Sequence, residues 1–180
     1  TSVRIGLIGA AISAGVALLL GLAAATLGRW VDRVVTWLID LFLGLPHLIA
    51  IILIAVAFGG GAKGIIIGVA ATHWTSLARV IRAEVMQLRA APYVELSRGF
   101  GRSSWWIATR HMLPHLLPQL TVGGILMFPH VILHEAAITF LGFGLSPHQP
   151  AIGIILNESM DYLASGYWWL AFFPGLCLLL

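Results

Sequence analysis

The sequence predicts an all-α protein, a polytopic bundle of transmembrane helices, on three observations. Apolar residue types make up 59% of the 180 residues and charged types only 9%, against roughly half and about a quarter in soluble domains. The mean hydropathy is +0.97. Several apolar runs reach a length of about 20 residues, which a helix needs to cross a bilayer. These figures exclude a soluble enzyme, a collagen-like or disordered chain and a disulfide-stapled secreted domain.

Five apolar runs within a single domain of residues 1–180 mark the predicted spans. They cover approximately 5–27, 34–58, 64–77, 113–141 and 168–180. Glycine and alanine recur through the first run, where they permit close packing of helices. The second run carries Asp40, Pro46 and His47. The fourth run is too long to cross without a bend, and the last is expected to be incomplete.

The basic residues predict which side of the membrane each connection faces. Arg29 and Arg33 follow the first span, and six further arginines lie within 79–110, after the third span. Two crossings separate these groups, so both lie on the side that the positive-inside rule makes cytoplasmic. The loop 142–167 contains no Lys or Arg and is placed outside. The basic residues behind the net charge of +3 are therefore interpreted as determinants of membrane topology rather than of nucleic-acid binding. Residues 79–112 are predicted to form a cytoplasmic loop.

This loop and the start of the next span contain a spaced pattern: an acidic residue, two further positions, a glycine and a closing Leu-Pro pair. Its residues are Glu95, Leu96, Ser97, Gly101, Leu113 and Pro114. The pattern resembles the EAA signature of ABC importer permeases, in which Leu96, Ser97 and His111 here replace two alanines and an isoleucine. The flanking segments 73–82 and 140–145 resemble the peptide and nickel branch of this family, in its C-type subunit.

The resemblance covers essentially the whole chain and implies the type I ABC importer permease fold, with the first helix and the end of the last helix missing from this sequence. It implies that Glu95–Gly101 couples the chain to ATPases. Alternating access would then move a di- or oligopeptide, or nickel or a metal chelate, into the cytoplasm. The implied partners are a second homologous permease, two ATPase subunits, an extracytoplasmic solute-binding protein and the lipid of a bacterial inner membrane. ATP and Mg²⁺ would bind the partner subunits, and no cofactor would bind this chain.

The residues of the loop suit that role on physical grounds. The chain has no G-x-x-x-x-G-K-[ST] phosphate loop, so it is not expected to be an enzyme and must receive work through a protein contact. Pro92 suits the first turn of a short helix, where Glu95 is favourable to the helix dipole. Gly101 permits a sharp turn, and Pro114 is expected to end the segment before the next span.

Seven histidines are many for so apolar a chain. His130 and His134 share one helical face, and Glu135 is adjacent to it. Imidazole and carboxylate are suitable ligands for a borderline divalent cation, which predicts a substrate path lined by these residues, with His130 and His134 as metal ligands. His47, directly after Pro46, is expected to face the same path. The alternative for this set is packing, with each side chain hydrogen-bonded to neighbouring helices.

An ion-driven secondary transporter is the alternative function, with Asp40 and Glu135 as proton sites. That alternative gives no reason for a loop that docks on an ATPase. A purely structural membrane subunit is a third hypothesis, under which changes to the loop would leave flux unaltered. The residue patterns leave open whether the substrate is a peptide or nickel.

Overall fold

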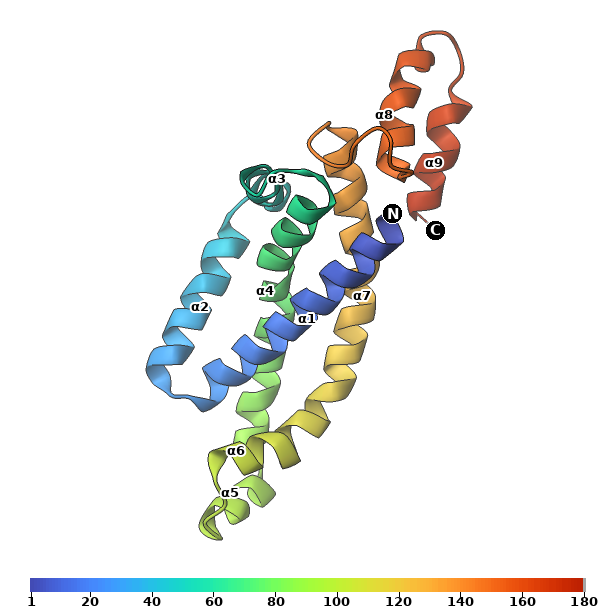
Figure 1. Cartoon of the computed structure of the whole chain (residues 1–180). Coiled ribbons are helices and arrows are strands. Elements are labelled where there is room, and N and C mark those ends of the chain that lie inside the picture. Colours follow the sequence, from blue (N-terminus) through green and yellow to red (C-terminus); the bar gives the residue numbers. More distant parts are fainter. Residues whose placement is uncertain (180) are drawn as a thin grey trace.

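Residues 1–179 are described by the computed structural model, and they fold into helices joined by turns and loops, with no strand among them. α1 (Ser2–Thr26), α4 (Gly61–Arg89) and α7 (Leu113–Phe140) pack together as the centre of the molecule. α1 runs diagonally across α4 and α7 (Figure 1). The all-α prediction is therefore confirmed for the described part of the chain.

Small residues allow α1 to approach its neighbours closely. Apart from Ile5, its buried positions are glycine, alanine or serine, namely Ser2, Gly6, Gly9, Ala10, Ser13, Ala17, Gly21, Ala24 and Ala25. A Cβ added at Gly21 would lie 2.9 Å from the Ile81 side chain of α4. A larger residue at Gly21 would therefore force the two helices apart.

The predicted second span, 34–58, is not one straight helix. It consists of α2 (Arg29–Gly44) and α3 (His47–Ala57), which meet at an angle of 100°. The break has a local cause. Leu45 is extended, with ψ of 144°, because the residue before a proline is disfavoured in the helical region, and Pro46 lacks an N–H for the helix. α3 therefore turns away from the direction of α2 and packs on α4 (Figure 1).

Glycines on α4 fix the position of α3. Gly64 and Gly68 are buried one helical turn apart and form a small-xxx-small pattern that permits close contact of helix backbones. Gly64 faces the backbone of Ala55, and a Cβ at Gly68 would lie 2.8 Å from the carbonyl oxygen of Ile51. Backbone therefore meets backbone where α3 and α4 cross.

The segment 79–112 differs from the predicted loop of short helices. α4 continues to Arg89, past the predicted end of the third span at residue 77, and α5 (Pro92–Gly99) and α6 (Ser104–Ile107) follow it. The physical reason is that the intervening residues are good helix formers without a glycine or proline. The apolar run ends near residue 77, but the helix has no reason to end there.

Pro114 does not end the preceding segment, which corrects the prediction made from its missing N–H. A wide turn, η1 (Ala108–Met112), joins α6 to α7, and the helix is continuous over Ser104–Phe140. In this turn the Leu113 N–H donates to the Ala108 carbonyl. The wider hydrogen bonding accommodates a proline in the first turn of α7, where one N–H fewer is tolerated.

The predicted outer loop, 142–167, contains a further helix. α8 (Ile152–Leu163) and α9 (Trp169–Leu179) form a hairpin beyond one end of α7 (Figure 1). α9 falls within the predicted fifth span, 168–180, whose last residue, Leu180, lies outside the described residues. The described part of that span is a helix of 11 residues.

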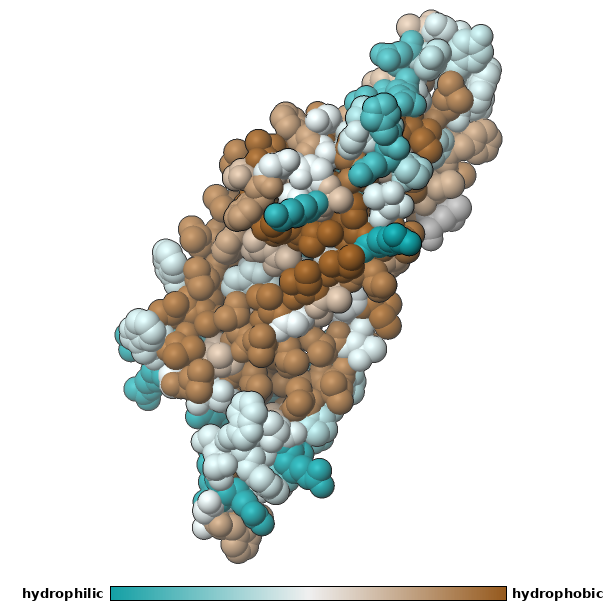
Figure 2. Space-filling view, in the orientation of Figure 1, coloured by the Kyte–Doolittle hydropathy of each residue, from teal (hydrophilic) through white to brown (hydrophobic). Residues whose placement is uncertain are grey.

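Apolar side chains cover the middle of the molecule. Figure 2 shows them over α1 and the surrounding bundle, with hydrophilic residues gathered towards the two ends. Among residues 1–179, three helices are long and apolar enough to cross a membrane, or four if the bent pair α2–α3 counts as one span. The three are α1, α4 and the continuous helix over Ser104–Phe140. This arrangement is that of a multi-pass membrane protein.

Candidate functional site

A cavity of about 460 Å³ lies between α2, α3, α4 and α7. The break between α2 and α3 borders it, because Leu45 and the first residue of α3, His47, both line the wall. Most of the wall is apolar, as at Leu77 and Met127. The polar lining residues are His47, Thr72, His73, Thr75, Ser76, His130 and His134. A largely apolar wall with a few polar groups is typical of a site for a small molecule.

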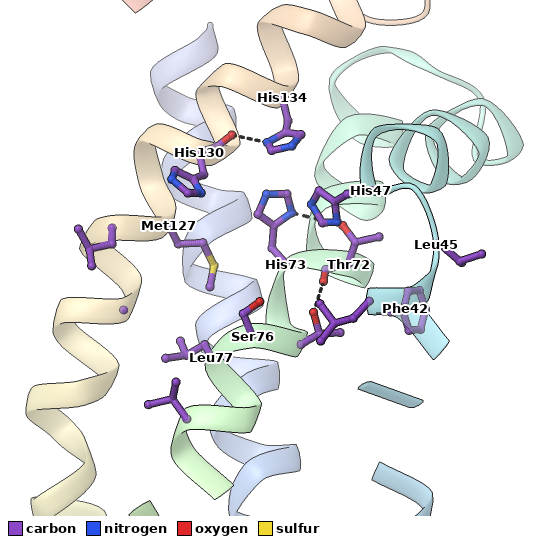
Figure 3. A pocket seen from close by; sticks show the side chains of 15 residues that line it. Phe42, Leu45, His47, Thr72, His73, Ser76, Leu77, Met127, His130 and His134 are labelled. Atoms are coloured by element: carbon purple, nitrogen blue, oxygen red, sulfur yellow. Dashed lines mark hydrogen bonds between the residues drawn. The ribbon is translucent and has the colours of Figure 1, made fainter. Parts of the chain in front are cut away.

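Three histidine rings from three different helices meet in this cavity (Figure 3). The ring centroids of His47 and His73 are 4.7 Å apart, and each lies 5.0 Å from the ring of His134. One nitrogen from each ring can be chosen such that all three lie within 4.8 Å of one another. This set, His47, His73 and His134, is called the histidine cluster below.

The histidines predicted for the substrate path do not all come together in the structure. His47, His130 and His134 line the cavity, but the predicted pair of metal ligands, His130 and His134, is not the group that comes together. His134 meets His47 and His73, whereas the His130 ring lies apart from the cluster (Figure 3). The contact between His130 and His134 runs through the backbone, since the His134 Nδ1 lies 2.7 Å from the His130 carbonyl oxygen.

His73 is the member of the cluster that sequence reasoning missed. It lies in the apolar run of α4, is only 9% exposed, and its Nδ1 is 3.3 Å from the Thr72 hydroxyl. Polar residues at 72, 73, 75 and 76 within an apolar helix are a signal of a lined cavity. The spacing of these residues along the chain does not indicate which other helices pack against them.

Glu135, predicted on the same path as the histidines, does not line the cavity. Its side chain is fully buried at 0% exposure, and its Oε1 accepts a hydrogen bond of 2.9 Å from the Thr139 hydroxyl. The Thr139 oxygen in turn accepts a bond of 3.2 Å from the Leu145 N–H. Consecutive residues on a helix point about 100° apart, so Glu135 faces away from the cavity and ties the end of α7 to the turn that follows it.

The predicted coupling segment forms a helix at the opposite end of the molecule from α3, beside α6 (Figure 1). Pro92 occupies the first turn of α5 and Glu95 also lies in that turn. Val94 is the one buried residue of α5, whereas Glu95 is exposed and Leu96 is 62% exposed. Gly101, with φ of +75°, turns the chain after α5, as its predicted role requires. α5 therefore presents an acidic and an apolar side chain outward.

Side-chain contacts of Tyr93 and Ser97 link α5 to the helix that leads into α7. The Ser97 hydroxyl lies 2.8 Å from the Tyr93 carbonyl oxygen, to which it donates, and 3.2 Å from His111 Nε2. The His111 ring also packs edge-on against Tyr93, with the centroids 5.5 Å apart. Two parts of the spaced pattern, separated along the chain, are thus in contact. Leu113 and Pro114 follow as the first residues of α7.

Arginines of α4 hold α1 and α2 in place. Arg82 forms a two-pronged ion pair with Asp32, in which Nη2 lies 2.8 Å from Oδ2 and Nε also contacts the carboxylate. Arg79 Nη2 lies 2.8 Å from the Asp40 carboxylate, and the Arg89 guanidinium donates to the Ala25 carbonyl at the end of α1. Two of these arginines therefore form ion pairs with α2, and the third binds the end of α1 through a hydrogen bond.

Comparison with known proteins is consistent with this architecture. The sequence profile of the family described as "Binding-protein-dependent transport system inner membrane component" matches residues 17–180. The chain is 30% identical over 174 residues to the dipeptide transport system permease protein DppC of Bacillus subtilis, which covers 97% of this chain and 54% of that protein. It is 34% identical over 177 residues to a peptide transport system permease protein of Brucella suis, with 98% and 59% covered. The chain therefore spans between 54% and 59% of the length of these relatives.

A solved structure shares the fold. A chain of the MetNI methionine ABC transporter, described in inward-facing conformations, matches with a TM-score of 0.70 at 16% sequence identity. The match covers 98% of this chain and 89% of that chain. The predicted permease fold is thereby confirmed.

Proposed function

The chain belongs to the family of binding-protein-dependent transport system inner membrane components, the permeases of ABC importers, and on that premise we propose that it moves peptides into the cytoplasm. The observation that carries the proposal is the profile match over residues 17–180 together with relatives named as peptide permeases. Hydrolysis of ATP on partner subunits would drive the movement. A second homologous permease, two ATPase subunits and a solute-binding protein would complete the assembly in a bacterial inner membrane.

A peptide is proposed as the substrate in preference to nickel. The relatives described above carry names of peptide or dipeptide transport systems. A peptide presents both apolar side chains and amide groups, and the cavity offers an apolar wall with hydroxyl and imidazole groups, which could hold both kinds of surface. The cavity lies within one permease subunit, so the partner permease would supply the rest of the path.

The proposed route of coupling runs from α5 to the cavity through α7. An ATPase would contact the exposed face of α5, where Glu95 and Leu96 project. Displacement of α5 would pass through the Ser97–His111 contact to a helix that is continuous over Ser104–Phe140. The same helix carries His130 and His134 at the cavity. A continuous helix that joins the two sites would carry movement of α5 to the cavity.

The ion-driven alternative is not favoured by the environment of its proton sites. Asp40 is paired with Arg79 at an exposed position and does not line the cavity. Glu135 is bonded to Thr139 and lies off the cavity. Neither carboxylate lines the described cavity wall, where a proton would have to be exchanged with the substrate path.

The test is charge reversal on α5 in the complete transporter. We expect Glu95→Lys to reduce co-purification of the ATPase subunits by about tenfold or more, because reversal of a contact charge weakens a protein interface strongly. ATP-dependent uptake of a labelled dipeptide into vesicles should fall with it. Glu158→Lys, which reverses an exposed acidic residue on α8, is the matched control and should leave association with the ATPase intact.

Two results would contradict the proposal. If Glu95→Lys retains the ATPase and full uptake, α5 is not the coupling element. If wild-type vesicles take up nickel with ATP but no di- or oligopeptide, the substrate assignment is wrong while the family assignment stands.

A further inference from the structure

We propose that the histidine cluster, His47, His73 and His134, binds one borderline divalent metal ion of the Zn²⁺ or Ni²⁺ class at the junction of α3, α4 and α7. This site goes beyond the proposed peptide transport, because its ligands belong to this chain and its occupancy does not depend on the cargo. It also differs from the site predicted from sequence, which paired His130 with His134.

The spacing of the three rings is close to that of a metal site. Tetrahedral zinc with Zn–N bonds of about 2.0–2.1 Å places its nitrogen ligands about 3.3 Å apart. The three candidate nitrogens here all lie within 4.8 Å of one another. Each pair therefore has to close by at most about 1.5 Å, which rotation of an imidazole about its side-chain bonds can supply. The rings meet edge to face, at interplanar angles of 62°, 81° and 88°, so none is stacked face to face on another.

In two of the rings, His134 and His73, hydrogen bonding at Nδ1 leaves Nε2 free to bind a metal ion. The His134 Nδ1 lies 2.7 Å from the His130 carbonyl oxygen, which can only accept, so Nδ1 carries the proton. The Thr72 hydroxyl is 3.0 Å from the Gly68 carbonyl oxygen, to which it donates, so it presents a lone pair to the His73 Nδ1 at 3.3 Å. In both neutral rings Nε2 therefore bears a lone pair. This outer arrangement is the one that metal-binding histidines commonly have.

The His73 Nε2 is an independent indication of a ligand. The side chain is 9% exposed and its Nε2 has no hydrogen-bond partner among the described residues. A buried polar atom without a partner is unfavourable, and Figure 3 shows the His73 ring in the cavity next to the rings of His47 and His134. A metal ion bound by these rings would supply the missing partner.

The donor set selects the class of ion. Three imidazoles without a carboxylate favour borderline metals such as Zn²⁺ or Ni²⁺ over Mg²⁺ and Ca²⁺, which require oxygen ligands. Three protein ligands leave a fourth position for water or another small donor. Because His47 begins α3, His73 lies on α4 and His134 lies on α7, a bound ion would also cross-link these helices.

The experiment is a metal titration of the complete transporter, purified without metal and without peptide. We measure Zn²⁺ binding by calorimetry and use Co²⁺ absorption to report tetrahedral coordination. The wild type should bind one more Zn²⁺ per copy of this chain than the His47→Ala/His73→Ala/His134→Ala variant, which accounts for metal sites elsewhere in the assembly. Each single substitution in the cluster should weaken binding by about tenfold or more.

Two controls and one positioning variant sharpen the test. His130→Ala keeps the backbone carbonyl that orients His134, and His148→Ala removes an exposed histidine, so both should leave this ion bound. Thr72→Val removes the hydroxyl beside His73 and should weaken Zn²⁺ binding about tenfold with an altered Co²⁺ spectrum. If His73→Ala fails to assemble, His73→Gln keeps the side-chain volume and should lose the ion in the same way.

The proposal is overturned if the wild type and the triple variant bind equal numbers of Zn²⁺ ions. Loss of the ion in His130→Ala but not in His73→Ala would also overturn it, because the ligands would then be His130 and His134, the pair on α7. Binding is measured without cargo or ATP, so its failure leaves peptide transport standing. Failure of peptide uptake likewise leaves the metal site standing.

Discussion

The cavity is held by close packing of helices, whereas α5 is held by a few contacts, although one continuous helix joins the two regions. At the cavity, the histidine cluster comes from three helices, of which α3 and α4 are held in backbone contact by Gly64 and Gly68, while the break at Pro46 sets the direction of α3. At α5, one buried residue, Val94, and the contact between Ser97 and His111 hold a helix whose other side chains are largely exposed.

This difference indicates how each region responds to substitution. Changes at the cavity displace backbone and should be visible as lost stability, because packed helices cannot shift by fractions of an ångström without cost. Changes at α5 should alter communication between subunits while the fold persists. The comparison therefore predicts a gradient, from large effects on folding at the α3–α4 contact to small effects on activity at α5.

The largest effect is expected at the contact between α3 and α4. Gly68→Leu should destabilise the protein by about 3 kcal/mol, because even a Cβ would approach the Ile51 carbonyl oxygen to 2.8 Å. Thermal unfolding of the purified transporter measures the change. Gly15→Leu, on α1, is the matched control, since nothing lies within 4 Å of a Cβ at that position. Equal loss in both variants would show that the close backbone contact does not position α3.

An intermediate effect is expected at the two ion pairs between α2 and α4. Arg82→Ala should cost about 2 kcal/mol, because it leaves a partly buried carboxylate without its two-pronged partner; the side chains of Arg82 and Asp32 are 25% and 28% exposed. Arg79→Ala should cost less than about 1 kcal/mol, since that pair is 57% and 60% exposed. Unfolding midpoints of the two variants compare them directly, and a larger loss for Arg79→Ala would contradict the burial argument.

Sequence reasoning predicted the exposed region better than the buried one. The α5 segment carries its information locally: Pro92 starts the helix, Glu95 lies in its first turn and Gly101 turns the chain, all of which follow from residue type and spacing. The all-α bundle likewise follows from composition and the lengths of apolar runs. None of these inferences needs knowledge of which helices pack together.

The cavity depends on contacts between helices, and the spacing of residues along the chain does not predict these contacts. Pro46 was visible in the sequence, yet an apolar run of sufficient length gave no sign that the span turns by 100° there. The partnership of His73 with His47 and His134 depends on three helices meeting. The absence of Glu135 from the cavity wall could have been predicted, because the side chain of its neighbour His134 points about 100° away.

The smallest effect is expected at the contact that joins α5 to α7. Ser97→Ala removes a hydroxyl that lies 3.2 Å from His111 Nε2, and loss of one such bond is worth about 1 kcal/mol, or about fivefold in a coupled rate. We expect peptide-stimulated ATP hydrolysis by the reconstituted transporter to fall by that factor while the unfolding midpoint stays unchanged. Thr109→Ala is the control, because the hydroxyl of Thr109 bonds only to carbonyls of its own helix, at Trp105 and Trp106. If both variants keep full activity, the coupling does not depend on this hydrogen bond, and the packing of Tyr93 against His111 or the backbone from α5 to α6 joins the two regions of the molecule instead.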